Sequence, residues 1–118
     1  MYKRQARRFG EVAATCDEVA TAAGRTGVVW GHKYQPWVGL GATREEAREH
    51  VATAMRRFYG LPFEAFEKYT PYGTPADVAE ALAPYVAAGV REFDMSLCAA
   101  DTDTAIGMAG EVKRLLSS

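Results

Sequence analysis

Two segments of the chain have the composition of β-strands, and a long stretch of helical sequence separates them. Residues 28–40 are rich in β-branched and aromatic side chains, but Gly31, Pro36 and Gly39 interrupt them. We expect a strand there whose distal half is irregular. Residues 90–98 alternate between large apolar and smaller or polar side chains, which indicates a second strand. Because parallel strands need a long and usually helical connection, this order predicts a parallel pair with helices outside it.

Helical periodicity and terminal signals surround both strands. Thr43 and Glu46 have the spacing of a capping box, and Thr74 followed by Pro75 is typical of another helix start. Between these helices we expect a short helical turn and then an irregular loop at residues 69–73. The apolar spacing predicts helices over residues 6–23, 43–59, 74–88 and 101–116, with the short turn at 63–68.

Composition excludes several classes of function. A chain of 118 residues with 48% hydrophobic residues fits one globular domain. Its 14 basic and 15 acidic residues give a net charge of -1, so we expect neither nucleic acid nor anionic membrane as a partner. No apolar run approaches the ~18 residues of a membrane span, and we expect a cytoplasmic protein.

The two cysteines, Cys16 and Cys98, lie far apart in the sequence and have no histidine at ligand spacing. Neither a zinc site nor a disulfide framework is therefore indicated. We expect both thiols to be reduced and buried, which is the usual state of cysteine in a globular domain. No metal is expected.

The first five residues fit no periodic pattern and join abruptly onto the first helix. Met1-Tyr2-Lys3-Arg4-Gln5 looks like the translation of a transposon end used in making sequencing libraries. We expect residues 1–5 to be a non-native scar that makes few contacts, and residues 6–118 to be the folded part. A natural basic N-terminal tail is the alternative.

Four short segments, in this order, resemble the C-terminal end of the luciferase-like monooxygenase family. The first is Thr-Arg-Glu-Glu-Ala-Arg at residues 43–48, and the second is Leu-Pro-Phe-Glu at residues 61–64. The third is Tyr-Gly-Thr-Pro-Ala-Asp-Val-Ala-Glu at residues 72–80, followed by the fourth, Val-Ala-Ala-Gly-Val at residues 86–90. Each segment alone is common, and only their order and spacing carry the resemblance.

Members of that family are (β/α)8 barrels that use reduced FMN or coenzyme F420. The resemblance implies an α/β fold, a partial TIM barrel that holds the last two strands with their flanking helices. Residues 43–69 would be an excursion, and the first six strands would be missing. A barrel of this kind needs about 250 residues and builds its active site from several loops. We therefore expect the C-terminal fragment of a flavin- or F420-dependent oxidoreductase or monooxygenase, inactive alone, whose small organic substrate is unknown.

The resemblance places no catalytic residue in this chain, because the family's flavin-phosphate contacts and bases lie upstream of the matched part. It does imply wall positions on the catalytic face of the barrel. These cofactor-binding candidates are Trp37, Gly73, Thr74, Ser96 and Cys98. The implied partners are the flavin and a small-molecule substrate, and a homodimer is compatible with this interpretation.

Two other functions remain open from the residues alone. One is a small α/β ligand-binding module that buries its strands by self-association. The other is an intact small enzyme, which the sequence disfavours because paired carboxylates, a nucleophile elbow and a metal cluster are all missing from it.

Overall fold

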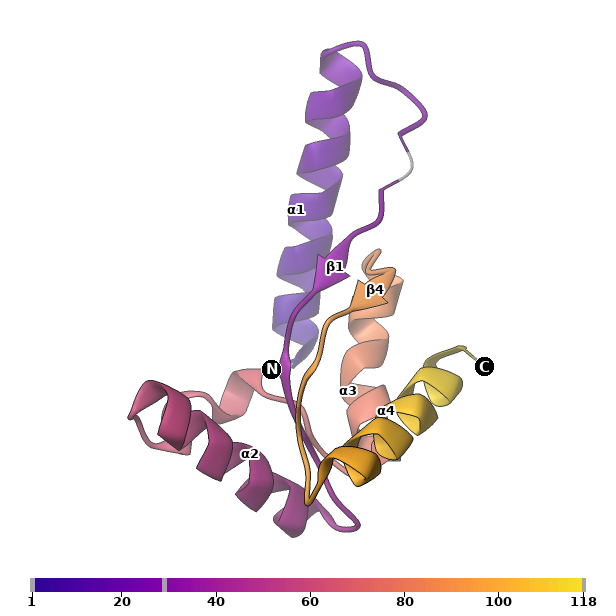
Figure 1. Ribbon diagram of the computed structural model, residues 1–118. Coiled ribbons are helices and arrows are strands. Elements are labelled where there is room, and N and C mark those ends of the chain that lie inside the picture. Colours follow the sequence, from indigo (N-terminus) through magenta and orange to yellow (C-terminus); the bar gives the residue numbers. More distant parts are fainter. Residues whose placement is uncertain (1, 29, 118) are drawn as a thin grey trace.

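The computed structural model describes residues 2–28 and 30–117, with side chains from residue 6 onwards. It is a mixed α/β structure in which helices surround short parallel strands (Figure 1). In chain order the elements are α1 (Tyr2–Ala22), β1 (Lys33–Tyr34), β2 (Trp37–Leu40), α2 (Arg44–Tyr59), the 3-10 turns η1 (Phe63–Ala65) and η2 (Glu67–Tyr69), β3 (Tyr72–Gly73), α3 (Pro75–Ala87), β4 (Glu92–Phe93), β5 (Ser96–Cys98) and α4 (Thr102–Ser117).

The two predicted strand segments lie side by side and run parallel, as the sequence indicated. β1 pairs with β4, and β2 pairs with β5, in one unchanged register. Backbone hydrogen bonds bridge the interruption between the short strands. Tyr34 accepts one from the amide of Asp94 at 2.9 Å, and Pro36 accepts one from the amide of Ser96 at 3.0 Å. β1 and β2 are thus one longer strand with a local break, and so are β4 and β5.

The prediction of an irregular distal half in the first strand is wrong. The distal half, β2, is the best-buried part of the sheet, while residues 28 and 30–32 form no strand. The segment 69–73 was also predicted to be an irregular loop, but its end forms β3. β3 pairs in parallel with the edge of β2 opposite to β5, so the order of this sheet is β3-β2-β5. The described strands do not close into a barrel.

One face of the strands packs against three helices. Val38 and Leu40 point to this face and are fully buried with Leu82 and Tyr85 of α3 and Val112 of α4. α3 contacts both α1 and α4, so the helices that alternate with the long strands form one layer in chain order (Figure 1). The large apolar residues of the second strand, Phe93, Met95 and Leu97, also pack against this core.

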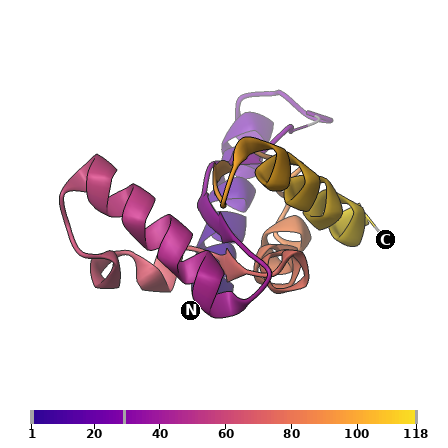
Figure 2. The same ribbon diagram turned by 60° about the horizontal axis from the view of Figure 1, so that its bottom comes forward.

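Among the described residues, the opposite face is covered only at the carboxyl ends of the strands, where α2 lies. Figure 2 shows α2 on one side of the strands and α3 and α4 on the other. Cys98 of β5 packs there with Val51 and Met55 of α2. The predicted excursion over residues 43–69 is therefore a cover for this face. Toward the amino ends the face is polar and exposed, and Lys33 lies 3.7 Å from Glu92 there.

The helix starts follow the capping signals with one difference. The Thr43 hydroxyl accepts from the amide of Glu46 at 3.2 Å, as predicted, but the Glu46 carboxylate lies 3.3 Å from His50. Its predicted return contact to the Thr43 amide is replaced by this pair one turn further along α2. Thr74 and Asp77 form the complete capping box instead.

The first helix begins earlier than predicted, because α1 includes Tyr2–Gln5. The side chains of these residues lie outside the described part, so the expectation that they make few contacts stays a prediction. None of the helices in the described residues is both long and apolar enough to span a membrane.

Gly39 should be the least tolerant position of β2. A Cβ atom there would lie 2.5 Å from the carbonyl oxygen of Ala47 and 2.8 Å from a methyl carbon of Val51. We expect Gly39→Ala to lower the free energy of unfolding by about 2 kcal/mol, as overpacking does. Urea denaturation followed by circular dichroism measures it. The control Gly107→Ala places a methyl group in open space on α4 and should raise stability by about 0.5–1 kcal/mol. Equal effects of the two substitutions would contradict this packing.

Candidate functional site

Trp37 is the predicted wall residue that lies among other aromatic rings. It lies at the start of β2, on the face that α2 covers, and its register partner on β5 is Ser96. Its ring is 5.4 Å from that of Phe58 and 5.9 Å from that of Tyr59, both at the end of α2. The half-buried indole thus connects the strand to a group of aromatic rings.

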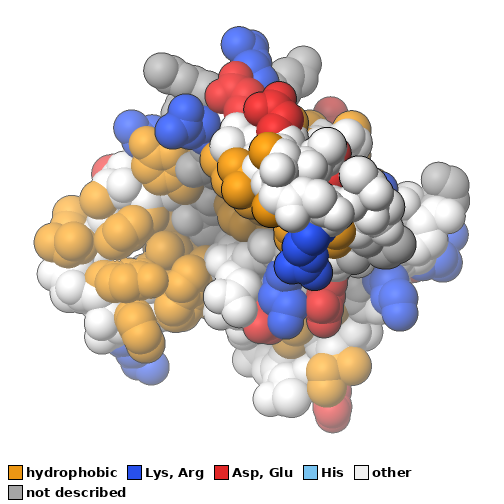
Figure 3. Space-filling model, turned by 90° about the horizontal axis from the view of Figure 1, so that it is seen from above, with side chains coloured by type: hydrophobic (Ala, Val, Ile, Leu, Met, Phe, Trp, Pro, Cys, Tyr) orange, Lys and Arg blue, Asp and Glu red, His pale blue; other side chains and the backbone are white. Residues whose placement is uncertain are grey.

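These rings form an exposed surface, which we call the aromatic patch. Phe58 is 70% exposed and Tyr59 is 44% exposed, although the two rings pack at 4.9 Å. Tyr59 also lies 4.9 Å from Phe66, between the two 3-10 turns. Leu61, 50% exposed, adjoins them in sequence, and the whole patch is Trp37, Phe58, Tyr59, Leu61 and Phe66. Figure 3 shows hydrophobic side chains gathered on the side where α2 lies.

The end of α2 explains why these rings are presented to solvent. Gly60 adopts a left-handed conformation, with φ of 69°, and its amide donates to the carbonyl of Arg56 at 2.8 Å. This turn reverses the chain within a few residues. The buried stripe of α2, which packs on the strands, ends one turn earlier, at Met55. Phe58 and Tyr59 therefore fall beyond the covered part of the strands.

A polar strip borders the patch on the sheet. The Gln35 amide donates to the Asp94 carboxylate at 3.1 Å, and Ser96 is exposed next to this pair. Trp37 stands at the boundary, with rings on one side and hydrogen-bonding groups on the other. A surface of this kind suits a flat, partly polar ligand, because aromatic faces stack on rings and polar groups fix their orientation.

Cys98 lies one position further along the same face but is buried beneath α2. Burial raises the pKa of its thiol to about 11, so the nucleophilic thiolate is scarce at neutral pH. Val51, which packs against it, also contacts Gly39, and these groups fill the space above the strand ends. Cys16, expected to be buried, is exposed on α1, because the distal half of that helix extends past the sheet.

Gly73 and Thr74 lie at the carboxyl end of the sheet, as expected, but their polar groups are already used. The Asp77 carboxylate accepts from the Thr74 amide and from its hydroxyl, both at 3.0 Å. Gly73 has φ of 145°, and a Cβ atom there would lie 2.5 Å from Asp77. This helix start is closed by its own carboxylate. Its geometry therefore does not fit a phosphate group.

The structure also contains a charged network that sequence reasoning missed. Arg48 of α2 donates to both carboxylate oxygens of Glu67, at 2.9 and 3.2 Å, and the Tyr72 hydroxyl donates to Glu67 at 2.7 Å. The guanidinium of Arg44 lies 4.6 Å from the centre of the Tyr72 ring. The two residues of the ion pair lie 19 positions apart in the sequence, and no local pattern marks it.

The network fixes the charges of its members. Hydrogen bonds from Arg48 and then from Tyr72 lower the pKa of Glu67 to about 2. Burial, followed by the bond to Glu67, raises the pKa of Tyr72, and the bond to Glu67 raises that of Arg48. These groups hold their charge states at neutral pH, so the network anchors η2 and β3 to α2 and does not transfer protons.

The structure brings together two of the five predicted wall residues on an open surface, Trp37 and Ser96. Cys98 is close in register but covered, while Gly73 and Thr74 belong to a closed cap. Within residues 6–28 and 30–117, no group of three His, Cys, Asp or Glu side chains could hold a metal ion.

Comparison of the chain with protein-family models, with curated proteins and with solved structures gives no match.

The depressed pKa of Glu67 predicts how stability changes with pH. The stability that Glu67 contributes is complete above its unfolded pKa of about 4.3 and is lost as the pH falls toward 2. We expect this contribution to be about 1 kcal/mol, since the ion pair is accessible to solvent. Urea denaturation between pH 6 and pH 2.5 should show a shallower pH dependence for Glu67→Gln than for the wild type. Glu64→Gln, which removes only a 3.7 Å contact to Arg48, is the control. Identical pH profiles for all three proteins would contradict the assignment.

Proposed function

We propose that this chain is the C-terminal part of a luciferase-like oxidoreductase barrel that uses FMN or coenzyme F420. In this role it supplies two barrel strands and part of the cofactor wall, while the catalytic groups belong to the remainder of the barrel. The observation that carries the proposal is that two long strands pair in parallel with each other. One layer of helices, α1, α3 and α4 in chain order, packs on one face of them.

A (β/α)8 barrel needs this arrangement of its consecutive units. Each strand is followed by a helix that packs outside, and neighbouring helices contact one another. Val38 and Leu40 face the helix layer, and Trp37 and Gly39 face the other way. In a barrel the second face points to the interior. The exposed polar groups on it, such as Lys33 and Gln35, would then point into the barrel. The preceding barrel strand would pair with β1, because β3 takes the second edge of β2.

The aromatic patch supports a flat cofactor beside Trp37, at the start of β2, where the cover of α2 ends. An isoalloxazine or deazaflavin ring fits against Trp37, with Ser96 and Gln35 near its polar edge. The phosphate of either cofactor does not fit the Thr74 helix start, which Asp77 already caps. The phosphate would be held by the remainder of the barrel. When bound, either cofactor would supply hydride chemistry.

The experiment that tests the proposal is to sequence the source DNA upstream of the Tyr2 codon. We expect an open frame that continues upstream and encodes six further strands alternating with helices. An in-frame stop codon with a ribosome-binding site directly before the Met1 codon would contradict the proposal. It would favour the small ligand-binding module instead.

Flavin titration gives an independent prediction. The chain of residues 1–118 alone should show no saturable binding of FMN or F420 at micromolar concentration, because the phosphate contacts are missing. In the protein encoded by the extended frame, Trp37→Ala should weaken cofactor binding about 10-fold, as loss of one aromatic contact does. Fluorescence of the cofactor measures both. Trp30→Ala is the matched control, since Trp30 stacks on His32 away from the patch.

Micromolar flavin binding by a monomer of the 118-residue chain would overturn the assignment. Equal loss of affinity in the Trp37 and Trp30 variants would remove Trp37 from the wall.

A further inference from the structure

The distal half of α1 carries an apolar stripe that nothing in the described chain covers. Only the start of the helix, Ala6 and Phe9, packs against the core. Beyond it, Val12 is 51% exposed, Val19 is 64% exposed and Cys16 is also exposed. Figure 1 shows that this half of α1 extends past the amino ends of the strands.

The spacing of the stripe is that of a coiled-coil seam. Val12, Cys16 and Val19 of α1, and Ala23 directly after its last residue, alternate steps of four and three residues, which places them at successive a and d positions. The amide of Ala23 still donates to the carbonyl of Val19 at 3.0 Å, as in a helix. We call these four residues the α1 seam. Thr15 and Ala20, which flank it, are small enough to allow a second helix to approach closely.

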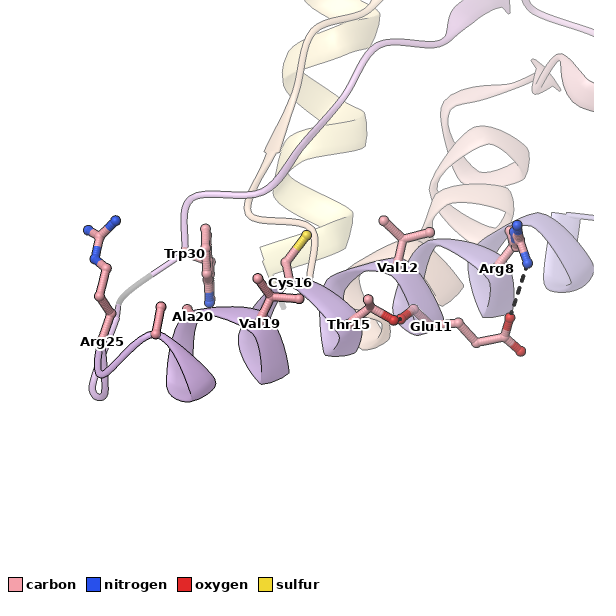
Figure 4. Close-up of a pocket in the computed structure, with 10 residues that line it drawn as sticks. Arg8, Glu11, Val12, Thr15, Cys16, Val19, Ala20, Arg25 and Trp30 are labelled. Atoms are coloured by element: carbon pink, nitrogen blue, oxygen red, sulfur yellow. Dashed lines mark hydrogen bonds and ion pairs between the residues drawn. The ribbon is translucent and has the colours of Figure 1, made fainter.

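The seam borders a groove of about 750 Å³ between α1 and the returning chain at residues 25 and 30. Figure 4 shows Val12 and Cys16 pointing to the same side of the helix, with Trp30 at one end of the row and Arg8 at the other. Trp30 is held in place by its indole N–H, which donates to Asp17 at 3.3 Å. The groove is thus a fixed, mainly apolar trough along one helix.

We propose that the occupant of this groove is α1 of a second copy of the chain, packed antiparallel across a two-fold axis. In that arrangement Val12 lies against Ala23 of the second copy, and Cys16 lies against Val19. Each layer then pairs a larger with a smaller side chain, and the same contacts repeat on both copies, as a two-fold interface requires. The seam is therefore complementary to itself.

The charges beside the seam favour the antiparallel direction. Glu11 lies at one end of the groove and Arg25 at the other, so the two-fold places each next to its opposite in the second copy. A parallel pair would instead bring Glu11 beside Glu11, Arg8 beside Arg8 and Arg25 beside Arg25. The pair between Arg8 and Glu11 within one helix is long, at 3.8 Å, and exposed, so Glu11 is free to turn toward Arg25 of the second copy.

The area of contact sets the expected strength. Four helical layers bury less than the ~1,000 Å² of a stable specific interface, so the dimer should be weak and reversible. We expect a dissociation constant on the order of 10 μM, which makes dimerisation visible in a concentration series. This interface involves neither the aromatic patch nor the open strand edges, and it does not depend on the proposed oxidoreductase function.

Sedimentation velocity of the 118-residue chain between 1 and 200 μM tests the pairing. We expect a shift from monomer to dimer across this range, and at least a 20-fold weaker association for Val19→Glu. Ala14→Glu adds the same charge on the outer side of α1 and should leave dimerisation unchanged. Circular dichroism confirms that both variants are folded. A monomer at all concentrations, or a dimer that survives Val19→Glu, would overturn the proposal.

Crosslinking tests the direction of the helices. In an equal mixture of the wild type with the double variant Cys16→Ser, Val19→Cys, the new thiol lies against Cys16 of the second copy, so mild oxidation should give a covalent dimer on a non-reducing gel. The double variant alone should give little crosslinking, because the new thiol then faces a serine. Buried Cys98 remains as an internal control that does not react. Crosslinking of the wild type alone as efficient as that of the mixture would indicate a parallel pair and overturn the antiparallel assignment.

Discussion

The structure depends on the burial of both faces of β2. Val38 and Leu40 are fully buried against the helix layer, while Gly39 lies directly beneath the backbone of α2. β2 also hydrogen-bonds on both edges, to β5 and to β3. A four-residue strand that is enclosed on every side fixes the positions of the elements around it. A side chain at position 39 would push α2 outward and uncover Cys98 and Val51.

That same packing decides what the surface presents. Because α2 lies close over the carboxyl ends of the strands, its last turn carries Phe58 and Tyr59 past the edge of the sheet. The ion pair of Arg48 with Glu67 holds the following turns back against α2 and brings Tyr72 into β3. The aromatic patch is therefore a product of the fold and not of a motif. Its rings come from a strand, a helix end and the junction between two 3-10 turns.

The polar inner face and the helix layer give the proposed barrel role its physical basis. One face of the strands is complete, with Tyr85 and Leu82 buried between helices. The other face is covered by α2 at the carboxyl ends and is polar at the amino ends. In the proposed barrel this polar part would face the interior. The seam on α1 belongs to neither face. It lies at a distance from the aromatic patch and would offer a second kind of contact, between copies.

The sequence by itself determined the kinds of element and their order. Alternation in residues 90–98, the cap at Thr43 and the Thr74 start are local signals, since they act through hydrogen bonds and side-chain directions within a few residues. Alternation also placed Phe93 and Leu97 on one side of the second strand, and the structure shows that this side faces the helices. Tertiary structure alone decided the role of the residues that interrupt the first strand segment. Gly39 does not break β2, but allows α2 to pack directly against it. Tertiary structure likewise decided that Tyr72–Gly73 is a strand, that Cys16 is exposed, and that Arg48 meets Glu67. Those outcomes depend on contacts between distant segments, whose distances no local pattern encodes.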